Sequence, residues 1–352
     1  MGMAAMVKKV IINGKFLSQK ITGVQRYARE TLNRLDSLVE NLDIELAIAE
    51  DAKDIPNLKN IKKKILSGKA SVFWEQIKLP IYIKKQNAIG VHLCHVAPII
   101  KPDIVCIHDA NVLRNPQWFT KTLVIWYGLI HSACALRAKK ILTVSNFSKK
   151  ELQAIFKIKD SRIENIGSGW QHIERIPYAV DTLERYNLKS KSFYFSLGTQ
   201  APHKNMKWIY QCARSNPNET FVLSGSFYNK VFKKTTESLP PNVRYLGYLS
   251  DSDVKTLMKE CKAFLFPSLY EGFGLPPLEA LSMGTTIFAS DIPIMREIFE
   301  DSVNYIDIHS QNYSLQSGFP NGSDKKASIL GKYNWQFVAE KILKTLHMIS
   351  EG

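Results

Sequence analysis

Short apolar runs alternate with amphipathic stretches along this chain. The runs are rich in Val, Ile, Leu and Phe and are bounded by Gly, Pro, Ser or Asp, which is typical of strands buried in a parallel sheet. The predicted strands are Val10–Asn13, Ile44–Ala49, Val91–His95, Ile104–Asp109, Ile141–Ser145, Phe193–Gly198, Phe221–Gly225, Ala263–Phe266 and Thr286–Ala289. Strands separated by helical segments predict an α/β protein with Rossmann-like parallel sheets.

Capping residues mark the starts of several helices between these strands. The predicted helices begin near Thr22, at Ser148 in a Ser-x-x-Glu capping box, at Asp251 and at Pro276–Pro277, and the last is an amphipathic helix over 335–350. The 352 residues are enough for two domains that each bury a core. A polar stretch of about residues 170–190 is expected to link a first domain, 1–175, to a second, 190–334.

Three segments have patterns that need separate interpretation. The lysine-rich stretch 53–69, with Lys62–Lys64, favours a solvated loop or helix face over a dedicated anion site. The Trp-Glu-Gln segment that starts at Trp74 indicates helix packing. The apolar stretch Leu123–Ile130 is too short and too closely flanked by charge for a membrane span. It is either a packed helix or an amphipathic face that lies on lipid with basic neighbours.

The positive charge is concentrated in the first half of the chain. The net charge is +15. Residues 1–189 hold 30 Lys and Arg against 17 Asp and Glu, a balance of +13, whereas residues 190–352 hold 17 against 15, a balance of +2. The first half is therefore expected to meet an anionic partner. No nucleic-acid-binding motif is visible, which favours a membrane surface or a phosphate group over nucleic acid.

The cysteines and the start of the chain bear on the cellular compartment. The five cysteines are scattered without a Cys-x-x-Cys pair, so neither a disulfide framework nor a zinc site is expected, and a reducing compartment fits. The first residues, through Lys9, lack an apolar core of signal-peptide length, so no export is expected.

The clearest candidate chemistry lies in Pro-Ser-Leu-Tyr-Glu-Gly-Phe-Gly-Leu-Pro-Pro-Leu-Glu-Ala at 267–280. Gly272 and Gly274 allow the backbone to approach a ligand closely, and the positive N-terminal end of the following helix suits a phosphate. Bound phosphate would repel Glu271 and Glu279, so these carboxylates are better placed to accept hydrogen bonds from sugar and ribose hydroxyls.

This string resembles the Glu-x7-Glu signature of the retaining GT-B glycosyltransferases of family 4, the glycosyl transferases group 1. The resemblance covers about residues 10–347, is strongest over 193–300, and points to polysaccharide and O-antigen mannosyltransferases within the family. It implies the GT-B fold, in which two Rossmann-like domains face a central cleft and the C-terminal helix crosses back to the first domain.

The resemblance assigns the donor nucleotide-sugar mainly to the second domain. Lys204 would neutralise the leaving diphosphate, Glu279 would bind the ribose and Glu271 the donor sugar. Many members also carry an arginine in the lysine's loop, where this chain has Thr199 and His203, so the source of a second positive charge stays open. Further donor contacts are assigned to Gly23, Gly198, Asn205, Tyr248, Leu249, Gly272, Phe273, Gly274 and Leu275.

The first domain is expected to bind the acceptor. His108 and Asp109 follow a predicted strand, and the ligand crevice of an open α/β sheet lies at the carboxyl ends of its strands. The family carries a histidine at this place near the reacting sugar. His108 and Asp109 are therefore assigned as catalytic with Lys204 and Glu271, without a covalent role for His108. Thr22, Arg26 and Ser145 are assigned to the acceptor side.

These features predict a retaining, metal-independent hexosyltransferase of class EC 2.4 that needs no cofactor. GDP-mannose is the first choice of donor, and a UDP-hexose or UDP-N-acetylhexosamine is the alternative. The expected acceptor is a lipid-linked oligosaccharide in bacterial O-antigen, capsule or lipopolysaccharide synthesis. The expected location is cytoplasmic, peripheral at the inner face of the membrane, with no nucleic-acid partner. A nucleotide-sugar epimerase and a non-catalytic binding subunit are the alternatives of another class.

Overall fold

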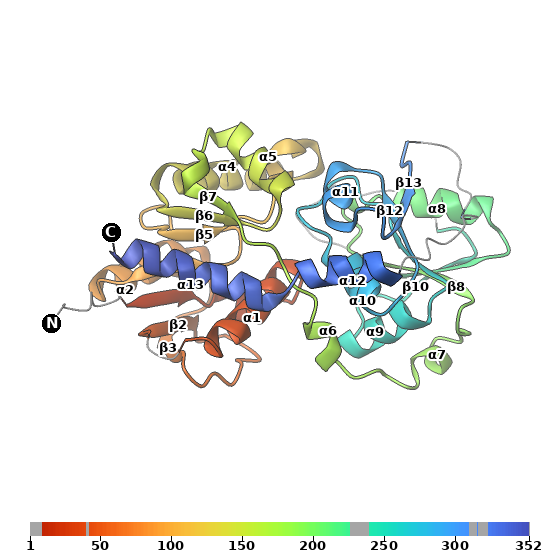
Figure 1. Cartoon of the computed structure of the whole chain (residues 1–352), viewed down its shortest axis with the longest axis horizontal. Helices are drawn as coiled ribbons and strands as arrows, with labels where there is room; N and C mark the ends of the chain where they lie inside the picture. Colours follow the sequence, from red (N-terminus) through yellow and green to blue (C-terminus); the bar gives the residue numbers. More distant parts are fainter. Residues whose placement is uncertain (1–8, 40–41, 226–238, 310–314, 316–322, 352) are drawn as a thin grey trace. The chain divides into compact units, whose positions relative to one another are not determined.

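The structure is a computed structural model that describes residues 9–39, 42–225, 239–309, 315 and 323–351 (Figure 1). The segment considered above for an export signal, residues 1–8, lies outside this set. The chain forms two compact units. Unit 1 comprises Met1–Leu113, Ile125–Gly169 and Asn334–Gly352, and unit 2 comprises Arg114–Val124 and Trp170–Tyr333.

Within the described residues, unit 1 is built on a seven-stranded parallel sheet in the order β3-β2-β1-β4-β5-β6-β7. The strands are β1 Val10–Asn13, β2 Ile44–Ala49, β3 Lys62–Leu66, β4 Ile89–His92, β5 Ile104–Cys106, β6 Lys140–Thr143 and β7 Ile163–Asn165. Five of them were predicted from the sequence: β1 and β2 have the predicted bounds, and β4, β5 and β6 overlap their predicted strands with shifted ends. Their side chains are buried almost throughout because helices cover both faces of the sheet.

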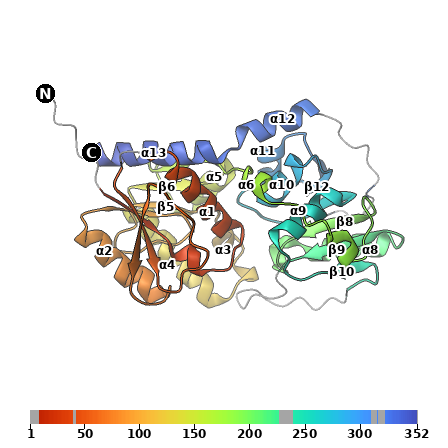
Figure 2. The same ribbon diagram turned by 90° about the horizontal axis from the view of Figure 1, so that it is seen from below.

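The helices of unit 1 are α1 Gly23–Asp36, the π-helix η2 Trp74–Lys78, α2 Leu79–Lys85, α3 Asn111–Arg114, α4 Lys121–Arg137, α5 Asn146–Phe156 and α13 Trp335–Glu351, with short 3-10 turns η1 Lys15–Ser18 and η4 Asp160–Arg162. The 3-10 turn η3 Pro116–Trp118 and the first residues of α4 belong to unit 2. Strand register places α2 and α4 on one face. Ile11 of β1 packs with α2 and pairs with Gly90 of β4. Val105 of β5 packs with α4 and pairs with His92, which lies two residues after Gly90 on β4. Residues two apart on a strand share a face. Figure 2 shows α1 and α13 on the opposite side of this sheet.

Two local predictions for unit 1 were wrong. Lys62–Lys64 lie on the edge strand β3 instead of a loop or helix face. Their side chains stay exposed, and lysines on an edge strand discourage further strand pairing. The helix predicted to start at Ser148 begins at Asn146, because the Ser145 hydroxyl oxygen accepts a hydrogen bond from the Ser148 amide at 3.0 Å and caps it.

Unit 2 is built on a six-stranded parallel sheet in the order β10-β9-β8-β11-β12-β13, counted over the described residues. The strands are β8 Phe193–Leu197, β9 Thr220–Ser224, β10 Val243–Tyr245, β11 Ala263–Phe266, β12 Ile287–Ser290 and β13 Asn304–Ile306. The helices are α6 His172–Arg175, α7 Thr182–Arg185, α8 Met206–Ser215, α9 Asp251–Glu260, α10 Leu275–Ser282, α11 Pro293–Phe299 and α12 Ser323–Lys332, with the 3-10 turn η5 Pro202–Lys204. The two parallel sheets confirm the predicted pair of Rossmann-like domains.

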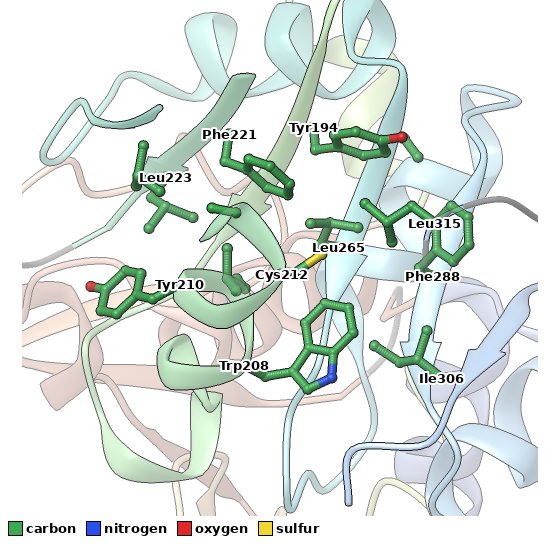
Figure 3. Packing of buried hydrophobic residues seen from close by; sticks show 14 residues of the cluster. Tyr194, Trp208, Tyr210, Cys212, Phe221, Leu223, Leu265, Phe288, Ile306 and Leu315 are labelled. Carbon is green, nitrogen blue, oxygen red and sulfur yellow. The ribbon is translucent and has the colours of Figure 1, made fainter. Parts of the chain in front are cut away.

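The core of unit 2 forms where α8 packs on its sheet (Figure 3). Trp208 and Cys212 from α8 meet Phe221 from β9 and Leu265 from β11. The Tyr194 and Phe221 rings stack with centroids 5.2 Å apart. Burial of such aromatic side chains contributes a large share of the stability of a core, and it fixes the strands whose carboxyl ends carry the candidate site.

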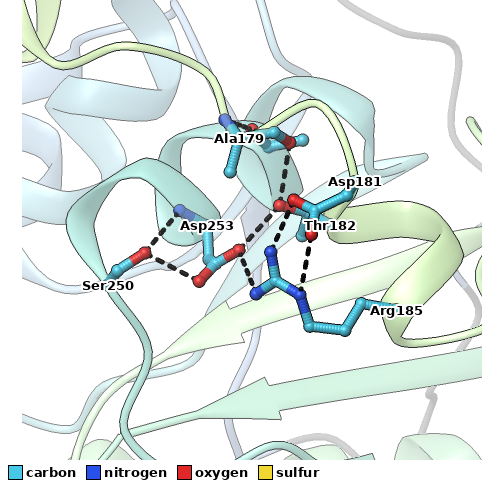
Figure 4. Close-up of polar contacts among 7 residues, drawn as sticks. Ala179, Asp181, Thr182, Arg185, Ser250 and Asp253 are labelled. Carbon is cyan, nitrogen blue, oxygen red and sulfur yellow. Dashed lines mark hydrogen bonds and ion pairs between the residues drawn. The ribbon is translucent and has the colours of Figure 1, made fainter.

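The stretch interpreted as a linker is ordered and attached to α9 in unit 2 (Figure 4). Asp253 accepts hydrogen bonds from the hydroxyls of Thr182 and Ser250, both at 2.7 Å, and from Arg185 at 3.0 Å. Burial raises the pKa of Asp253, but the bonds from Ser250 and Thr182 and the charge of Arg185 outweigh it and hold this pKa below the usual value. The network fixes α7 against the start of α9.

The C-terminal helix α13 belongs to unit 1 and packs on α1. The Tyr27 and Trp335 rings meet edge to face at 5.5 Å, and Val338 and Ile342 on α13 are fully buried. The amphipathic pattern predicted this helix correctly. No helix in the described part of the chain has the length and apolar character needed to cross a bilayer.

Candidate functional site

The Glu-x7-Glu stretch forms a strand, a glycine loop and a helix, as its pattern predicted. β11 ends at Phe266, the loop runs to Gly274, and α10 begins at Leu275 with prolines in its first turn. Gly274 has φ +109°, a conformation that residues with a side chain rarely adopt, and an added Cβ would lie 2.9 Å from the Met295 methyl carbon. Pro276 and Pro277 have no amide hydrogen, so the backbone donors at the positive end of α10 are the amides of Gly274 and Leu275.

Lys204 and Glu271 are in direct contact. Lys204 ends η5 after β8, and Glu271 lies in the loop after the neighbouring strand β11. The Lys204 Nζ lies 2.6 Å from Glu271 Oε1, and both side chains are largely but not wholly buried. The amide of Leu269 donates to the His203 carbonyl at 2.7 Å, which ties the two loops together. Two residues that the sequence assigned to the donor are therefore neighbours.

Glu279 lies on the second turn of α10 and is buried. His172 of α6 donates from Nε2 to Glu279 Oε1 at 2.7 Å, and its ring is buried too. The sequence analysis did not single out His172, because 107 residues separate the pair and nothing local in sequence connects them. The only available signal was a histidine two residues after the Gly-Ser-Gly-Trp segment of residues 167–170.

Glycines occupy the carboxyl ends of three neighbouring strands, β8, β9 and β10. Gly198 donates to the Ser224 carbonyl at 2.9 Å, and Gly225 donates to the Gly247 carbonyl at 2.8 Å. Gly225 has φ +148°, and an added Cβ would lie 1.9 Å from the Gly198 carbonyl oxygen, so no other residue fits. Of the two predicted donor contacts that follow Gly247, Tyr248 is exposed and Leu249 is buried.

The remaining predicted donor residues surround this edge of the sheet. Asn205 has φ +52° and joins η5 to α8. Phe273 is buried and meets the Tyr333 ring edge to face at 5.1 Å. At the two positions where the resembled family places arginine, Thr199 is partly exposed and the His203 ring lies 6.2 Å from that of Trp118 and 6.5 Å from that of Phe119. His203 is therefore part of an aromatic group.

In unit 1, His108 is buried just beyond β5. Its Nε2 lies 2.8 Å from the Leu93 carbonyl oxygen, and its ring meets Tyr27 edge to face at 4.6 Å. Burial, followed by the nearby His95, lowers the pKa of His108 to about 3. The imidazole is therefore neutral near pH 7, with its proton on Nε2 and the Nδ1 lone pair left as an acceptor.

Asp109 and two further histidines extend this group. The Asp109 carboxylate accepts from the Asn111 amide at 2.8 Å and lies 3.8 Å from His95 Nε2. His95 has φ +52°, which is uncommon for a residue with a side chain, and the His131 Nε2 donates to its carbonyl at 3.2 Å. Burial lowers the pKa of His95 to about 3 and that of His131 to about 4. The sequence analysis assigned neither His95 nor His131.

The other predicted acceptor residues lie at helix starts of unit 1. Thr22 and Gly23 are exposed at the N-terminus of α1, and an added Cβ on Gly23 would meet no atom within 4 Å. Arg26 is in the first turn, where its amide donates to the Thr22 carbonyl at 2.8 Å. Ser145 is buried and serves as the cap of α5, so its hydroxyl is already engaged.

A polar cluster beyond β1 was missed by the sequence analysis. Glu75, buried on η2, accepts from Asn13 Nδ2 at 2.9 Å and from Lys15 Nζ at 2.7 Å. The Trp-Glu-Gln segment does serve helix packing, since Trp74 is buried, but its glutamate also holds a lysine beside the carboxyl end of β1.

Among the described residues, neither a disulfide nor a candidate metal site adds to this site. All five cysteines are free thiols, and four of them are buried. Within the same residues, no three His, Cys, Asp or Glu side chains are grouped so that they could hold a metal ion.

The family model described as Glycosyl transferases group 1 matches residues 183–314, which lie within unit 2. Unit 2 carries a glycosyl transferases group 1 domain. The matched range contains Lys204, Glu271 and Glu279, and the chain is accordingly a glycosyltransferase, as the resemblance implied.

Known proteins of this kind are similar over nearly the whole chain. The chain is 26% identical over 327 residues to an O-antigen chain mannosyltransferase B of Escherichia coli, covering 84% of this chain and 85% of the relative. Sucrose-phosphate synthase from Thermosynechococcus elongatus has a similar fold, with a TM-score of 0.72 at 13% identity over 97% of this chain and 99% of that one. Anabaena HepE, solved in complex with UDP and glucose, gives 0.69 at 12% identity over 97% and 100%. The fold of this glycosyltransferase is therefore GT-B.

Proposed function

We propose that this glycosyltransferase transfers mannose from GDP-mannose to a hydroxyl of a lipid-linked oligosaccharide, with retention of the anomeric configuration, in the synthesis of a bacterial surface polysaccharide. The observation that carries the proposal is the Lys204–Glu271 ion pair beside the open N-terminal end of α10. The similarity to the O-antigen mannosyltransferase supports mannose as the sugar.

The diphosphate of the donor would be held by two positive features of unit 2. The positive N-terminal end of α10, with the amides of Gly274 and Leu275, and the Lys204 ammonium both attract negative charge, and Lys204 already lies beside the glycine loop. When the sugar departs, charge develops on the diphosphate, so contacts that strengthen at that moment accelerate the reaction. No metal ion is required in this proposal. Activity that survives excess EDTA would agree with it, and restoration of activity by Mg²⁺ or Mn²⁺ after chelation would contradict it.

The hydroxyl groups of the donor would be bound by the two glutamates. Glu279 would accept from the ribose hydroxyls with the oxygen that His172 does not occupy. Glu271 would exchange its bond to Lys204 for bonds to the hydroxyls of the sugar, since Lys204 would turn to the phosphates. Both carboxylates are acceptors, which suits hydroxyls and disfavours phosphate.

The acceptor would be bound by unit 1. The neutral His108 presents Nδ1 as a hydrogen-bond acceptor, and the partly exposed Asp109 follows it in sequence. A hydroxyl of the acceptor or of the transferred sugar could donate to either group. Thr22, Gly23 and Arg26 supply an exposed helix start of the kind that attracts an anion.

A UDP-sugar is the second candidate donor, because HepE was solved with UDP and glucose. A thermal-shift series with GDP-mannose, UDP-glucose and UDP-N-acetylglucosamine separates the two. Selective stabilisation by GDP-mannose, followed by an axially linked product in the proton NMR spectrum, is the expected result. Stabilisation by the UDP-sugars alone would overturn the choice of donor. Incubation with donor alone tests the epimerase alternative, which requires a changed donor sugar without any acceptor.

The enzyme is further proposed to act at an anionic membrane surface, because its N-terminal half carries most of the net positive charge. Co-flotation with phosphatidylglycerol vesicles at low salt is expected, and recovery of all protein in the unbound fraction would contradict it.

A further inference from the structure

Exposed apolar side chains gather on one face of unit 1. α2 and the preceding η2 place Phe73, Ile77 and Ile81 in solvent at four-residue intervals, on the side away from the buried Trp74 and Ile83. In a soluble helix the outward side is normally polar, so a repeated apolar residue there indicates a surface that meets another apolar phase.

A second exposed stripe runs along α4. Ile125, Leu129 and Leu136 are separated by four and seven residues, which puts them on one side of a helix. All three are exposed, whereas Ile130 and Cys134 point to the core. The interpretation of this segment was left open between a packed helix and a lipid-facing one, and α4 has a buried side that packs on the core and an exposed apolar side opposite it.

The two stripes lie on the same face of the sheet and meet at one loop. The Gln76 side chain donates to the Ala97 carbonyl at 3.1 Å and accepts from the Ile99 amide at 3.0 Å. Arg137, at the end of α4, donates to the Ile99 carbonyl at 3.0 Å. The residue after Ile99 is Ile100, which is 73% exposed. The bonds thus hold η2, α4 and the loop that carries this isoleucine together.

We define this surface as the apolar face: Phe73, Ile77, Ile81, Ile100, Ile125, Leu129 and Leu136. The segments that carry it are rich in basic residues, three of which are paired with acids: Lys101 with Asp103 at 3.2 Å, Lys140 with Glu164 at 3.4 Å and Lys149 with Asp160 at 2.6 Å. Residues 125–150 contain Arg137, Lys139, Lys140, Lys149 and Lys150 and no Asp or Glu. Residues 69–101 contain Lys69, Lys78, Lys84, Lys85 and Lys101, and their one acidic residue, Glu75, is buried against Lys15 and Asn13.

We propose that the apolar face inserts into the interfacial region of an anionic lipid bilayer while the surrounding lysines and arginines contact its headgroups. An apolar surface whose own segments carry an excess of positive charge fits a phase that is apolar inside and anionic at its boundary. A second copy of this chain would bring the same excess of positive charge against itself, and the like charges would repel. The inference rests on the proposed membrane location and adds which residues make the contact.

The test compares three proteins on vesicles of 70% phosphatidylcholine and 30% phosphatidylglycerol, a mixture chosen to supply anionic charge. The first is the wild type, the second is I125E/L129E/L136E, and the third is the control Val180→Glu. Val180 is almost fully exposed and belongs to unit 2, whereas the apolar face is made of residues of unit 1. We expect the triple variant to bind vesicles at least about tenfold more weakly while the control binds as the wild type. Circular dichroism melting checks that each variant is folded.

Three results would overturn the proposal: equal vesicle binding by the triple variant and the wild type, no vesicle binding by the wild type, or a wild-type dimer in sedimentation that the triple variant abolishes. Transfer from nucleotide-sugar to a short, water-soluble acceptor is measured in parallel. None of the substituted residues is part of the candidate catalytic machinery, so the triple variant should keep this activity. Absence of transfer by the wild type itself would instead contradict the proposed function. A failure of the membrane proposal can therefore be told apart from a failure of the proposed function.

Discussion

The Lys204 ammonium lies 2.6 Å from the Glu271 carboxylate, although the two residues are 67 positions apart. They meet because β8 and β11 are neighbours in a parallel sheet, so the loops that follow these strands leave at the same edge. Without a donor, each charge is neutralised by the other. A donor would give the lysine a diphosphate and the glutamate a set of hydroxyls, so the pair holds both side chains in place before the substrate arrives.

Replacement of Lys204 by alanine should lower kcat by about a hundredfold to a thousandfold, the usual effect of removing one group that stabilises developing negative charge. K204R should retain part of the activity because it keeps the charge. The control is Lys262→Ala, since Lys262 pairs with Glu219 at 2.6 Å at the opposite, amino-terminal end of β11. Steady-state kinetics with saturating acceptor measure the effect. A K204A enzyme no slower than K262A would contradict the role of Lys204.

His172 should act as a positioning residue for Glu279. Its Nε2 proton occupies one carboxylate oxygen and fixes the direction of the other. H172A is expected to raise KM for the donor about tenfold with little change in kcat, because ribose contacts hold the ground state and the transition state alike. H172Q, which can still donate, should restore part of the affinity.

A double-mutant cycle checks that His172 works through Glu279. If it does, H172A should add little to the defect of E279A, since the two side chains act on the same contact. Fully additive effects on donor affinity, or a fall in kcat with unchanged KM, would show that His172 has a separate role.

Buried histidines should make unit 1 less stable in mild acid. Burial lowers the pKa of His92 to about 3, so the unfolded chain binds a proton below about pH 6.5 that the folded chain does not. The free energy of unfolding therefore falls as the pH drops from 6.5 towards 3, by about 1.4 kcal/mol per pH unit for each such group.

Urea unfolding between pH 7 and pH 4.5 measures this dependence. His92→Leu should reduce its slope by close to one proton. The control His347→Leu removes an exposed histidine of α13 and should leave the slope unchanged. An identical pH dependence in H92L and the wild type would contradict the assignment.

Asp253 should be a stability residue without a part in transfer. Its carboxylate accepts hydrogen bonds from Ser250, Thr182 and Arg185. D253A removes this shared acceptor and should lower the free energy of unfolding by about 2–3 kcal/mol. The neighbouring Asp251 is exposed at the start of the same helix, and D251A should cost well under half of that. Denaturation followed by tryptophan fluorescence gives both values. Similar losses for the two variants would mean that the network adds little.

The sequence predicted those features that depend on residues close together in the chain. Strands such as Val10–Asn13 and Ala263–Phe266 are apolar throughout, and a strand buried on both faces of a parallel sheet admits little else. The glycine loop and the proline-started helix after it follow from local backbone preferences. The Glu-x7-Glu string then led to the correct family and fold, because its residues are consecutive and need no knowledge of the rest of the chain.

Only the tertiary structure decided which distant residues meet. His172 reaches Glu279, and Lys15 and Asn13 reach Glu75, through strand order and helix placement that no local pattern specifies. It likewise decided that Lys62–Lys64 form an edge strand, since pairing with β2 supplies the backbone hydrogen bonds that their composition does not predict. Local composition limits the conformation of each segment, whereas partners across the chain are set by the packing that buries the most apolar surface and leaves the fewest polar groups unpaired.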